Sequence, residues 1–151
     1  MNKRATTKHV CGGDLIQTWR ERPADLDFEI RFYERLVQDY PDFVDALIPL
    51  GDAYTKRGHH DRGLAIDQRL AQLRPDDPIV WYNMACSFSI LKRVPEALKA
   101  LAHAIALGYN EFGWILRDPD LAEVRRAPAF QAFLAKVRPV RRTRPSQQRS
   151  A

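Results

Sequence analysis

The side chains best suited to chemistry in this chain are two adjacent imidazoles followed by a carboxylate, His59, His60 and Asp61. Imidazole nitrogens and carboxylate oxygens are common zinc ligands. A metal site needs three or four ligands that converge on one ion, whereas adjacent side chains in a helix or turn diverge. The three residues also occupy an expected turn between helices, where polar residues are common. The sequence therefore predicts no metal site.

Two cysteines, Cys11 and Cys86, are the other reactive groups. Their number and spacing do not suggest a disulfide framework, which fits a reducing compartment and predicts a cytoplasmic protein. No flanking base or cation is visible that would activate the thiol of Cys86. The chain also lacks a glycine-rich phosphate loop, a nucleophile elbow and a helix with paired metal ligands. We therefore expect a protein that is not an enzyme and has no cofactor.

Charge is distributed unevenly along the chain. The 24 lysines and arginines exceed the 19 acidic residues, and the formal net charge is +5. Nine of the basic residues lie in residues 1–10 and 136–151, which contain no acidic residue, so residues 11–135 hold 15 basic and 19 acidic residues. The basic surplus belongs to the ends of the chain, and a basic groove on the fold is not implied.

The arginine-rich C-terminal end allows two interpretations. Arg138, Arg141, Arg142 and Arg144 could contact the phosphates of a nucleic acid or another anionic surface. The same composition equally describes a disordered tail without a target. We favour the tail and keep nucleic-acid association as the alternative. At the other end, no apolar run long enough for a signal peptide or a membrane span follows the basic N-terminus, so we expect no membrane association.

A 34-residue repeat runs through the middle of the chain and aligns residues 44–77 with residues 78–111. Side chains of similar size occupy equivalent positions in the two blocks. The equivalent pairs are Leu47 and Trp81, Leu50 and Met84, Gly51 and Ala85, Tyr54 and Phe88, Gly63 and Ala97, and Leu70 and Ala104. A repeat of this length indicates supersecondary units that stack on one another to bury a continuous core.

Each block shows the apolar periodicity of two successive helices. Small residues at Gly51 and Gly63 let the two helices of a hairpin approach closely. Gly58 stands where the first helix should end. Pro49 falls inside that helix, and we expect it to kink the helix near residues 45–49 without ending it.

These positions resemble the signature of the tetratricopeptide repeat family, which is a tryptophan, then Leu-Gly and a tyrosine at fixed spacing, then small residues and a closing proline. The first block contributes Leu50, Gly51, Tyr54 and Pro75, and the second contributes Trp81, Ala97 and Ala104. The resemblance implies an all-α fold of antiparallel helix hairpins arranged in a right-handed superhelix. It also implies a protein that binds other proteins.

We expect about two full repeats with additional helices at both ends. Residues 25–40, followed by Pro41, resemble the second helix of a preceding half-repeat. After the second block, Asp118 and Pro119 interrupt a third first helix and are suited to begin a new one. The final predicted helix presents an apolar stripe that would cap the core, formed by Phe130, Phe133, Leu134 and Val137.

This closing segment resembles that of small bacterial tetratricopeptide proteins, which suggests a bacterial origin. The predicted organisation has three parts. Residues 1–24 form a flexible or partly ordered segment, residues 25–137 form the helical repeat domain, and residues 138–151 form a basic disordered tail.

In the tetratricopeptide family the first helix of each hairpin lines a concave groove that holds a peptide or helix of a partner. The resemblance places the following residues in that groove: Asp45, Ile48, Asp52, Thr55, Lys56, Ile79, Tyr82, Asn83, Cys86, Ser89 and Ile90. Anchor contacts are expected at its apolar members, although Ile48 and Ile79 can equally pack between helices. We expect Tyr82 to be exposed in the groove, because its hydroxyl needs water or a polar partner.

One group within the family binds the C-terminal carboxylate of chaperones through lysine, asparagine and arginine side chains. Here Ile48 and Asp52 replace a lysine and an asparagine, and Gly113 replaces another lysine, while only Asn83 and Arg117 agree with the pattern. The carboxylate of Asp52 would repel such a ligand. We therefore expect a protein or peptide partner other than a chaperone C-terminus.

Overall fold

The computed structural model describes residues 23–137, and within this range the chain forms helices and no strands. In chain order the helices are α1 (Pro23–Asp39), α2 (Val44–Arg57), α3 (His60–Leu73), α4 (Pro78–Ile90), α5 (Val94–Ala106), α6 (Phe112–Ile115), the 3-10 helix η1 (Pro119–Leu121), α7 (Ala122–Arg126) and α8 (Ala129–Val137). The predicted all-α class is confirmed. The two end segments predicted to be flexible or disordered are residues 1–24 and 138–151, and they lie outside the described residues except for Pro23 and Ala24, which begin α1.

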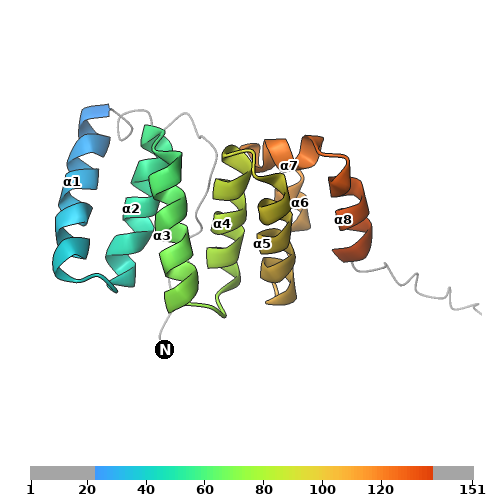
Figure 1. Cartoon of the computed structure of the whole chain (residues 1–151), viewed down its shortest axis with the longest axis horizontal. Helices are drawn as coiled ribbons and strands as arrows, with labels where there is room; N and C mark the ends of the chain where they lie inside the picture. The colour runs from blue at the N-terminus through green and yellow to red at the C-terminus, as the bar shows by residue number, and fades with distance from the viewer. Residues whose placement is uncertain (1–22, 138–151) are drawn as a thin grey trace, which may run out of the picture.

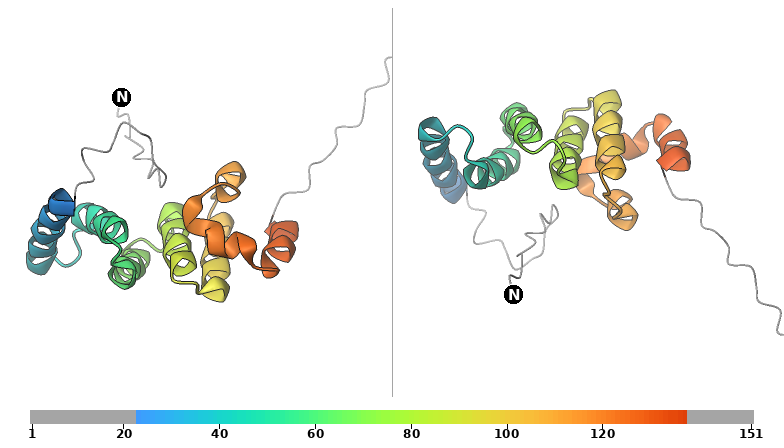
Figure 2. Two further views of the ribbon diagram at one scale, coloured as in Figure 1. Left: turned by 90° about the horizontal axis from the view of Figure 1, so that it is seen from above. Right: turned by 90° about the horizontal axis from the view of Figure 1, so that it is seen from below.

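The longer helices pack in the order of the sequence. α1 packs on α2, α2 on α3, α3 on α4 and α4 on α5, and together they form a row of helices (Figure 1). Seen along the helix axes, α2, α4 and α6 lie toward one side of this row, and α3 and α5 lie toward the other (Figure 2). The predicted helical-repeat architecture is therefore present, with the first helices of the two blocks on a shared side.

Two glycines allow α2 and α3 to approach closely. A Cβ atom added to Gly63 would lie 2.8 Å from Oγ1 of Thr55 and 3.6 Å from the carbonyl oxygen of Gly51. The second hairpin has Ala85 and Ala97 at the equivalent positions, and both are fully buried. The pairing of small residues in the sequence thus reflects a helix contact with little room for larger side chains.

The two hairpins turn with similar backbone geometry, 34 residues apart. Gly58 ends α2 with φ of 85°, and its amide donates a hydrogen bond to the carbonyl of Thr55 at 3.0 Å. Lys92 holds the equivalent place after α4 with φ of 60°, and its amide donates to the carbonyl of Ser89 at 2.8 Å. Positive φ is costly for a residue with a Cβ atom. The two blocks therefore share a positive φ angle at equivalent positions, and in the second block this angle falls on Lys92, which is strained by its Cβ atom.

The first helix of the first block continues through its proline. α2 is uninterrupted from Val44 to Arg57 although Pro49 lies inside it. Proline has no amide hydrogen, so the carbonyl of Asp45 lacks its usual helical donor. Survival of the helix was predicted, and the kink remains a prediction.

The closing segment begins where the sequence indicated. The Asp118 carboxylate accepts a hydrogen bond from the amide of Asp120 at 2.9 Å, and Pro119 occupies the first turn of η1. At the end of the described chain, Phe130 of α8 is 2% exposed and Phe133 packs against the same core. The C-terminal end of the row is therefore closed by its own apolar side chains, as predicted.

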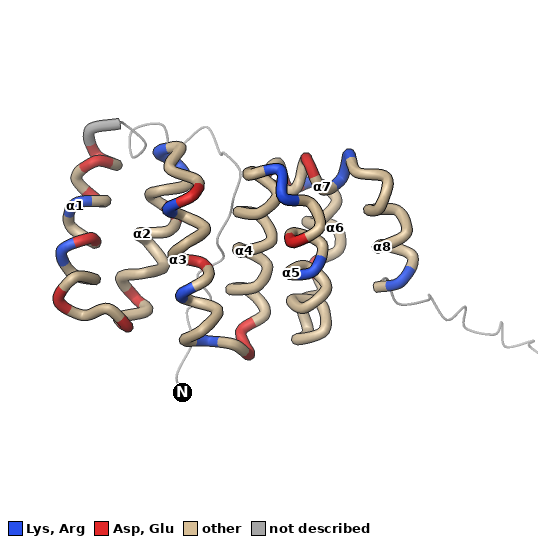
Figure 3. Tube along the Cα trace, in the orientation of Figure 1, with Lys and Arg blue, Asp and Glu red and all other residues tan. Residues whose placement is uncertain are grey.

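Charged residues occur along most of the row, including α1 (Figure 3). Arg57 pairs with Asp27 at 2.7 Å, and Arg62 pairs with Glu34 at 3.2 Å, which links α1 to α2 and α3. The Tyr54 hydroxyl donates a hydrogen bond to Glu34 at 2.6 Å. Exposed ion pairs of this kind add little stability, and the inward face of α1 is the one that buries Leu26 and Ile30 against α2.

One carboxyl group lies inside the interface between the two hairpins. Asp67 of α3 is 8% exposed, and its Oδ2 accepts a hydrogen bond from the hydroxyl of Ser87 on α4 at 2.5 Å. Burial raises the pKa of Asp67 to about 7, and the Ser87 hydrogen bond opposes this shift less strongly. The folded chain therefore holds a proton on Asp67 at pH values where the unfolded chain has lost it.

The first prediction concerns the pH dependence of stability. The free energy of unfolding should fall as pH rises from about 4 to about 7, by up to roughly 4 kcal/mol, because ionised Asp67 is favoured in the unfolded chain. Asp67→Asn should remove this component, so its stability relative to wild type should rise across the same window. Urea denaturation at a series of pH values measures the effect, with the exposed Asp76→Asn as control. Parallel pH profiles for wild type and Asp67→Asn would contradict the prediction.

A second prediction concerns the strained turn. Lys92→Gly should raise the free energy of unfolding by about 1 kcal/mol, because glycine adopts positive φ without a Cβ clash. Gly58→Ala should lower it, and since an added Cβ there has no neighbour within 4 Å, only the backbone conformation is tested. Thermal denaturation of both variants provides the measurement. Equal melting temperatures would show that the two turns carry no strain.

Candidate functional site

The predicted groove residues lie on α2 and α4, the two long helices on the shared side of the row (Figure 2). The residues that remain at least partly exposed are Asp45, Ile48, Asp52, Thr55, Lys56, Ile79, Asn83 and Ile90, and the buried ones are Tyr82, Cys86 and Ser89. We call the partly exposed set the α2–α4 surface. The division between the two sets decides which side chains are available to a partner.

Tyr82 was predicted to be exposed in the groove, and this prediction is wrong. Its side chain is 4% exposed, and its ring stacks on Tyr109 with the ring centres 4.3 Å apart. Its hydroxyl donates a hydrogen bond of 2.5 Å to Oδ2 of Asp118. The polar partner that a buried tyrosine requires is thus supplied by the chain itself rather than by water or a ligand.

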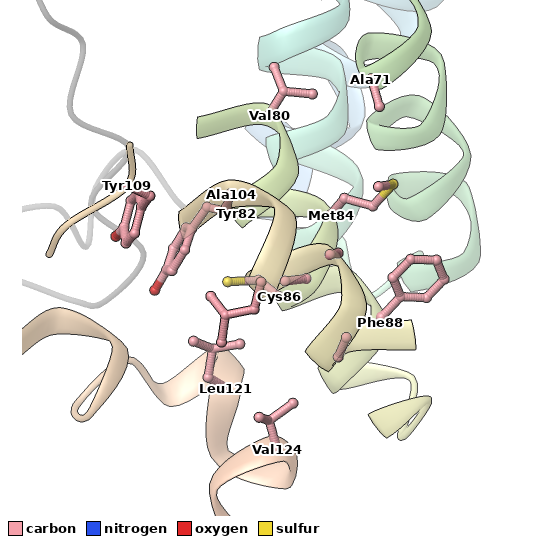
Figure 4. Packing of buried hydrophobic residues seen from close by; sticks show 14 of the residues in the cluster. Ala71, Val80, Tyr82, Met84, Cys86, Phe88, Ala104, Tyr109, Leu121 and Val124 are labelled. Carbon is pink, nitrogen blue, oxygen red and sulfur yellow. The ribbon is translucent and has the colours of Figure 1, made fainter. Parts of the chain in front are cut away.

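The burial of Tyr82 results from the break in the closing segment. Asp118 is fully buried and begins η1, which packs on α4 together with α7. Figure 4 shows the rings of Tyr82 and Tyr109 side by side, with Leu121 of η1 near Cys86. Burial raises the pKa of Tyr82 well above its ordinary value and that of Tyr109 to about 12, so both phenols stay protonated.

Two further predicted groove residues are also inside the protein. Cys86 is 4% exposed, with its sulfur 3.8 Å from Oδ2 of Asp118, and Ser89 is fully buried. Among the described residues the Ser89 hydroxyl has no hydrogen-bond partner. The middle of α4 therefore belongs to the core between the second hairpin and the closing segment, and its groove assignment is corrected.

The α2–α4 surface combines apolar and acidic side chains. Ile79, near the start of α4, is 44% exposed, while Ile48 is half-buried and packs partly on the core. Asp45 is exposed, and Asp52 forms an ion pair with Lys56 at 2.9 Å. This surface therefore exposes the aliphatic side chain of Ile79 on α4 and the carboxylate of Asp45 on α2, while the charge of Asp52 is paired with Lys56.

The two adjacent histidines have different surroundings. The ring of His59 lies edge-on to Tyr54 with 6.2 Å between ring centres, whereas Nδ1 of His60 is buried without a hydrogen-bond partner in the described part of the chain. Across residues 23–137, no three histidine, cysteine or acidic side chains are placed to hold a metal ion.

The four arginines proposed for nucleic-acid contact, at positions 138, 141, 142 and 144, lie outside the described residues.

The role of Asp118 as a partner of Tyr82 was missed from the sequence. Only its role in beginning a helix was predicted, and both roles are present. A signal existed, since a tyrosine in a helix that is packed on both sides needs a polar group nearby.

None of the helices in residues 23–137 is both long and apolar enough to cross a bilayer.

Comparison with known proteins gives partial similarities. No family model matches the chain. The chain is 31% identical over 87 residues to a chloroplastic protein of Arabidopsis thaliana, and 38% identical over 86 residues to Tetratricopeptide repeat protein 13 of Homo sapiens. These regions are 56% and 54% of this chain but 26% and 10% of the two relatives, so it spans only a small part of each. The similarity supports a tetratricopeptide-like helical repeat.

The buried tyrosine yields a third prediction. Tyr82→Phe should lower the free energy of unfolding by about 1–3 kcal/mol, because Asp118 loses a hydroxyl donor in a buried site. Tyr40→Phe is the matched control, since Tyr40 is 64% exposed and its hydroxyl can bond to water. Chemical denaturation of both variants measures the difference. Equal stability of the two variants would argue against the Tyr82–Asp118 hydrogen bond.

Proposed function

We propose that this chain is a tetratricopeptide-like module that binds a segment of another protein and has no catalytic role. The observation that carries the proposal is the exposed side chain of Ile79 on α4, a helix that lies on the same side of the row as α2 with its exposed Asp45. Exposed aliphatic side chains on the shared side of a helical repeat are suited to anchor a peptide or helix. The partial similarity to a protein named for tetratricopeptide repeats supports the same class.

The chemistry of the α2–α4 surface narrows the kind of partner. Ile79 and Ile48 favour an apolar side chain and Asp45 favours a positive charge, whereas the charge of Asp52 is already paired with Lys56. A segment that presents an aliphatic or aromatic residue next to a lysine or arginine fits this combination. A free C-terminal carboxylate fits less well beside Asp45, which would repel it, whereas Lys56 offsets the charge of Asp52.

The closing segment limits the size of the binding surface. Because η1 and α7 pack on α4 and Tyr82, Cys86 and Ser89 are buried, a partner has access to α2 and to the two ends of α4, at Ile79 and Ile90. Because the accessible surface is limited to parts of two helices, we expect modest affinity for a single site.

The fourth prediction tests this function. A random-peptide display library screened on the purified protein should enrich sequences that combine an apolar and a basic residue. Ile79→Asp should weaken binding of an enriched peptide at least about fivefold, because loss of a central anchor costs more than about 1 kcal/mol. Fluorescence polarisation with the labelled peptide measures the affinity.

The control is Gln68→Asp, which adds the same charge at an exposed position of α3 on the other side of the row. It should bind like wild type, and both variants should keep the wild-type melting temperature. Failure to enrich any sequence, or equal binding by the two variants, would refute the proposed surface.

A further inference from the structure

The outer face of α1 carries two exposed aromatic rings. Phe28 is 64% exposed and Phe32 is 52% exposed, and their rings stack with centres 6.4 Å apart. The opposite face of the helix places Leu26 and Ile30 in a core with α2. α1 is thus apolar on two opposite faces, of which the described chain buries one.

The position of α1 in the row makes this exposure unusual. α1 is the first helix of the described chain, and its extensive packing within that part is on α2 (Figure 1). The terminal element of a helical stack normally turns a polar face outward. At the other end of this row, α8 closes the stack and its Phe130 is buried in the core. A stacked pair of phenylalanines at the open end indicates an interaction surface.

Acidic and basic residues of α1 lie on opposite sides of the two aromatic rings. At about 100° per residue, Asp25 and Glu29 fall on one side of the Phe28–Phe32 stripe, and Arg31 falls with Arg35 on the other. The aromatic stripe therefore runs between an acidic edge and a basic edge. Such a face complements itself if it meets a second copy with acidic edge against basic edge.

We propose that the outer face of α1 pairs with the same face of a second copy, with the two α1 helices parallel about a two-fold axis along their length. A parallel two-fold places each acidic edge against the partner's basic edge, and it places Phe28 and Phe32 against their own copies. An antiparallel pair would bring like edges together, which costs energy. The order of Asp25, Glu29, Arg31 and Arg35 on α1 therefore favours the parallel arrangement, although this arrangement also sets the two Asp39 carboxylates near each other.

The geometry of the remaining chain is compatible with this pairing. The ion pairs of Arg57 with Asp27 and of Arg62 with Glu34 hold the opposite face of α1 against α2 and α3, so pairing leaves the row intact. α1 has 17 residues, which corresponds to roughly 25 Å of helix. One helix-on-helix contact of this length buries less area than a standard interface, so the dimer should be weak and dependent on concentration. This pairing does not rest on the proposed binding of another protein.

The fifth prediction uses the oligomeric state as its measurement. Sedimentation velocity of the full chain over a wide concentration range should show a reversible monomer–dimer equilibrium. Phe28→Glu with Phe32→Glu should abolish the dimer, because four buried carboxylates would face one another. Leu116→Glu is the matched control, since Leu116 is also an exposed apolar residue at 43% but lies at the end of α6. The control should dimerise like wild type with an unchanged melting temperature.

Charge exchange tests the direction of pairing. Glu29→Arg alone and Arg31→Glu alone should each weaken the dimer, and the double exchange should restore it. In a Cys11→Ser background, Asp39→Cys should form an intermolecular disulfide on oxidation, because parallel helices place position 39 beside its own copy. Gln68→Cys should not form one.

Three results would overturn the proposal. A protein that remains monomeric at every concentration has no such pairing. A dimer unaffected by both charge reversals, or not linked through position 39, is not parallel through α1. A dimer that appears only after residues 1–22 are removed shows that the N-terminal segment, rather than a second copy, covers this face.

Discussion

The close contact between the two helices of each hairpin is the constraint on which the rest of the structure depends. With Gly63 beside Thr55 and Gly51 in one hairpin, and two buried alanines in the other, the helices pack with little side-chain volume between them. This contact holds α2 and α4 on one side of the row, and so it defines the surface that a partner could reach. The same spacing brings α3 against α4, where Asp67 meets Ser87. Larger side chains at the glycines would separate the hairpin and shift the elements that follow it.

The repeated architecture could be predicted because it depends on residue size at fixed spacing. The sequence correctly indicated the hairpins, the turn at Gly58, the new start at Asp118 and the closing role of Phe130. The position of Tyr82 could not be predicted in the same way. Periodicity describes a residue in a complete array, whereas the segment beside α4 is broken at Asp118 and turns inward. The fate of Tyr82 therefore depended on a contact between residues 36 positions apart, which no repeat pattern encodes.

The two ends of the described row differ in whether their apolar side chains are covered. A stack of amphipathic helices leaves an apolar face at each end. At the C-terminal end, η1, α7 and α8 cover this face and bury polar groups with it, including the hydroxyl of Tyr82. At the N-terminal end of the described chain, α1 presents aromatic rings between opposite charges. Recognition is thus expected at the open end and along α2, while the closed end contributes stability.

The closing segment also has a consequence for the order of events on the ribosome. A chain emerges from its N-terminus, so α2, α3, α4 and α5 leave the exit tunnel before Asp118 does. Until that residue is available, the nascent second hairpin lacks the partner of Tyr82, and the inner side of α4 faces solvent. Domains often begin to fold during synthesis, yet here the core around α4 is complete only after Asp118 and the helices that follow it have emerged. In a nascent chain, the side of α4 that is buried in the finished protein is therefore exposed until the closing segment has been synthesised.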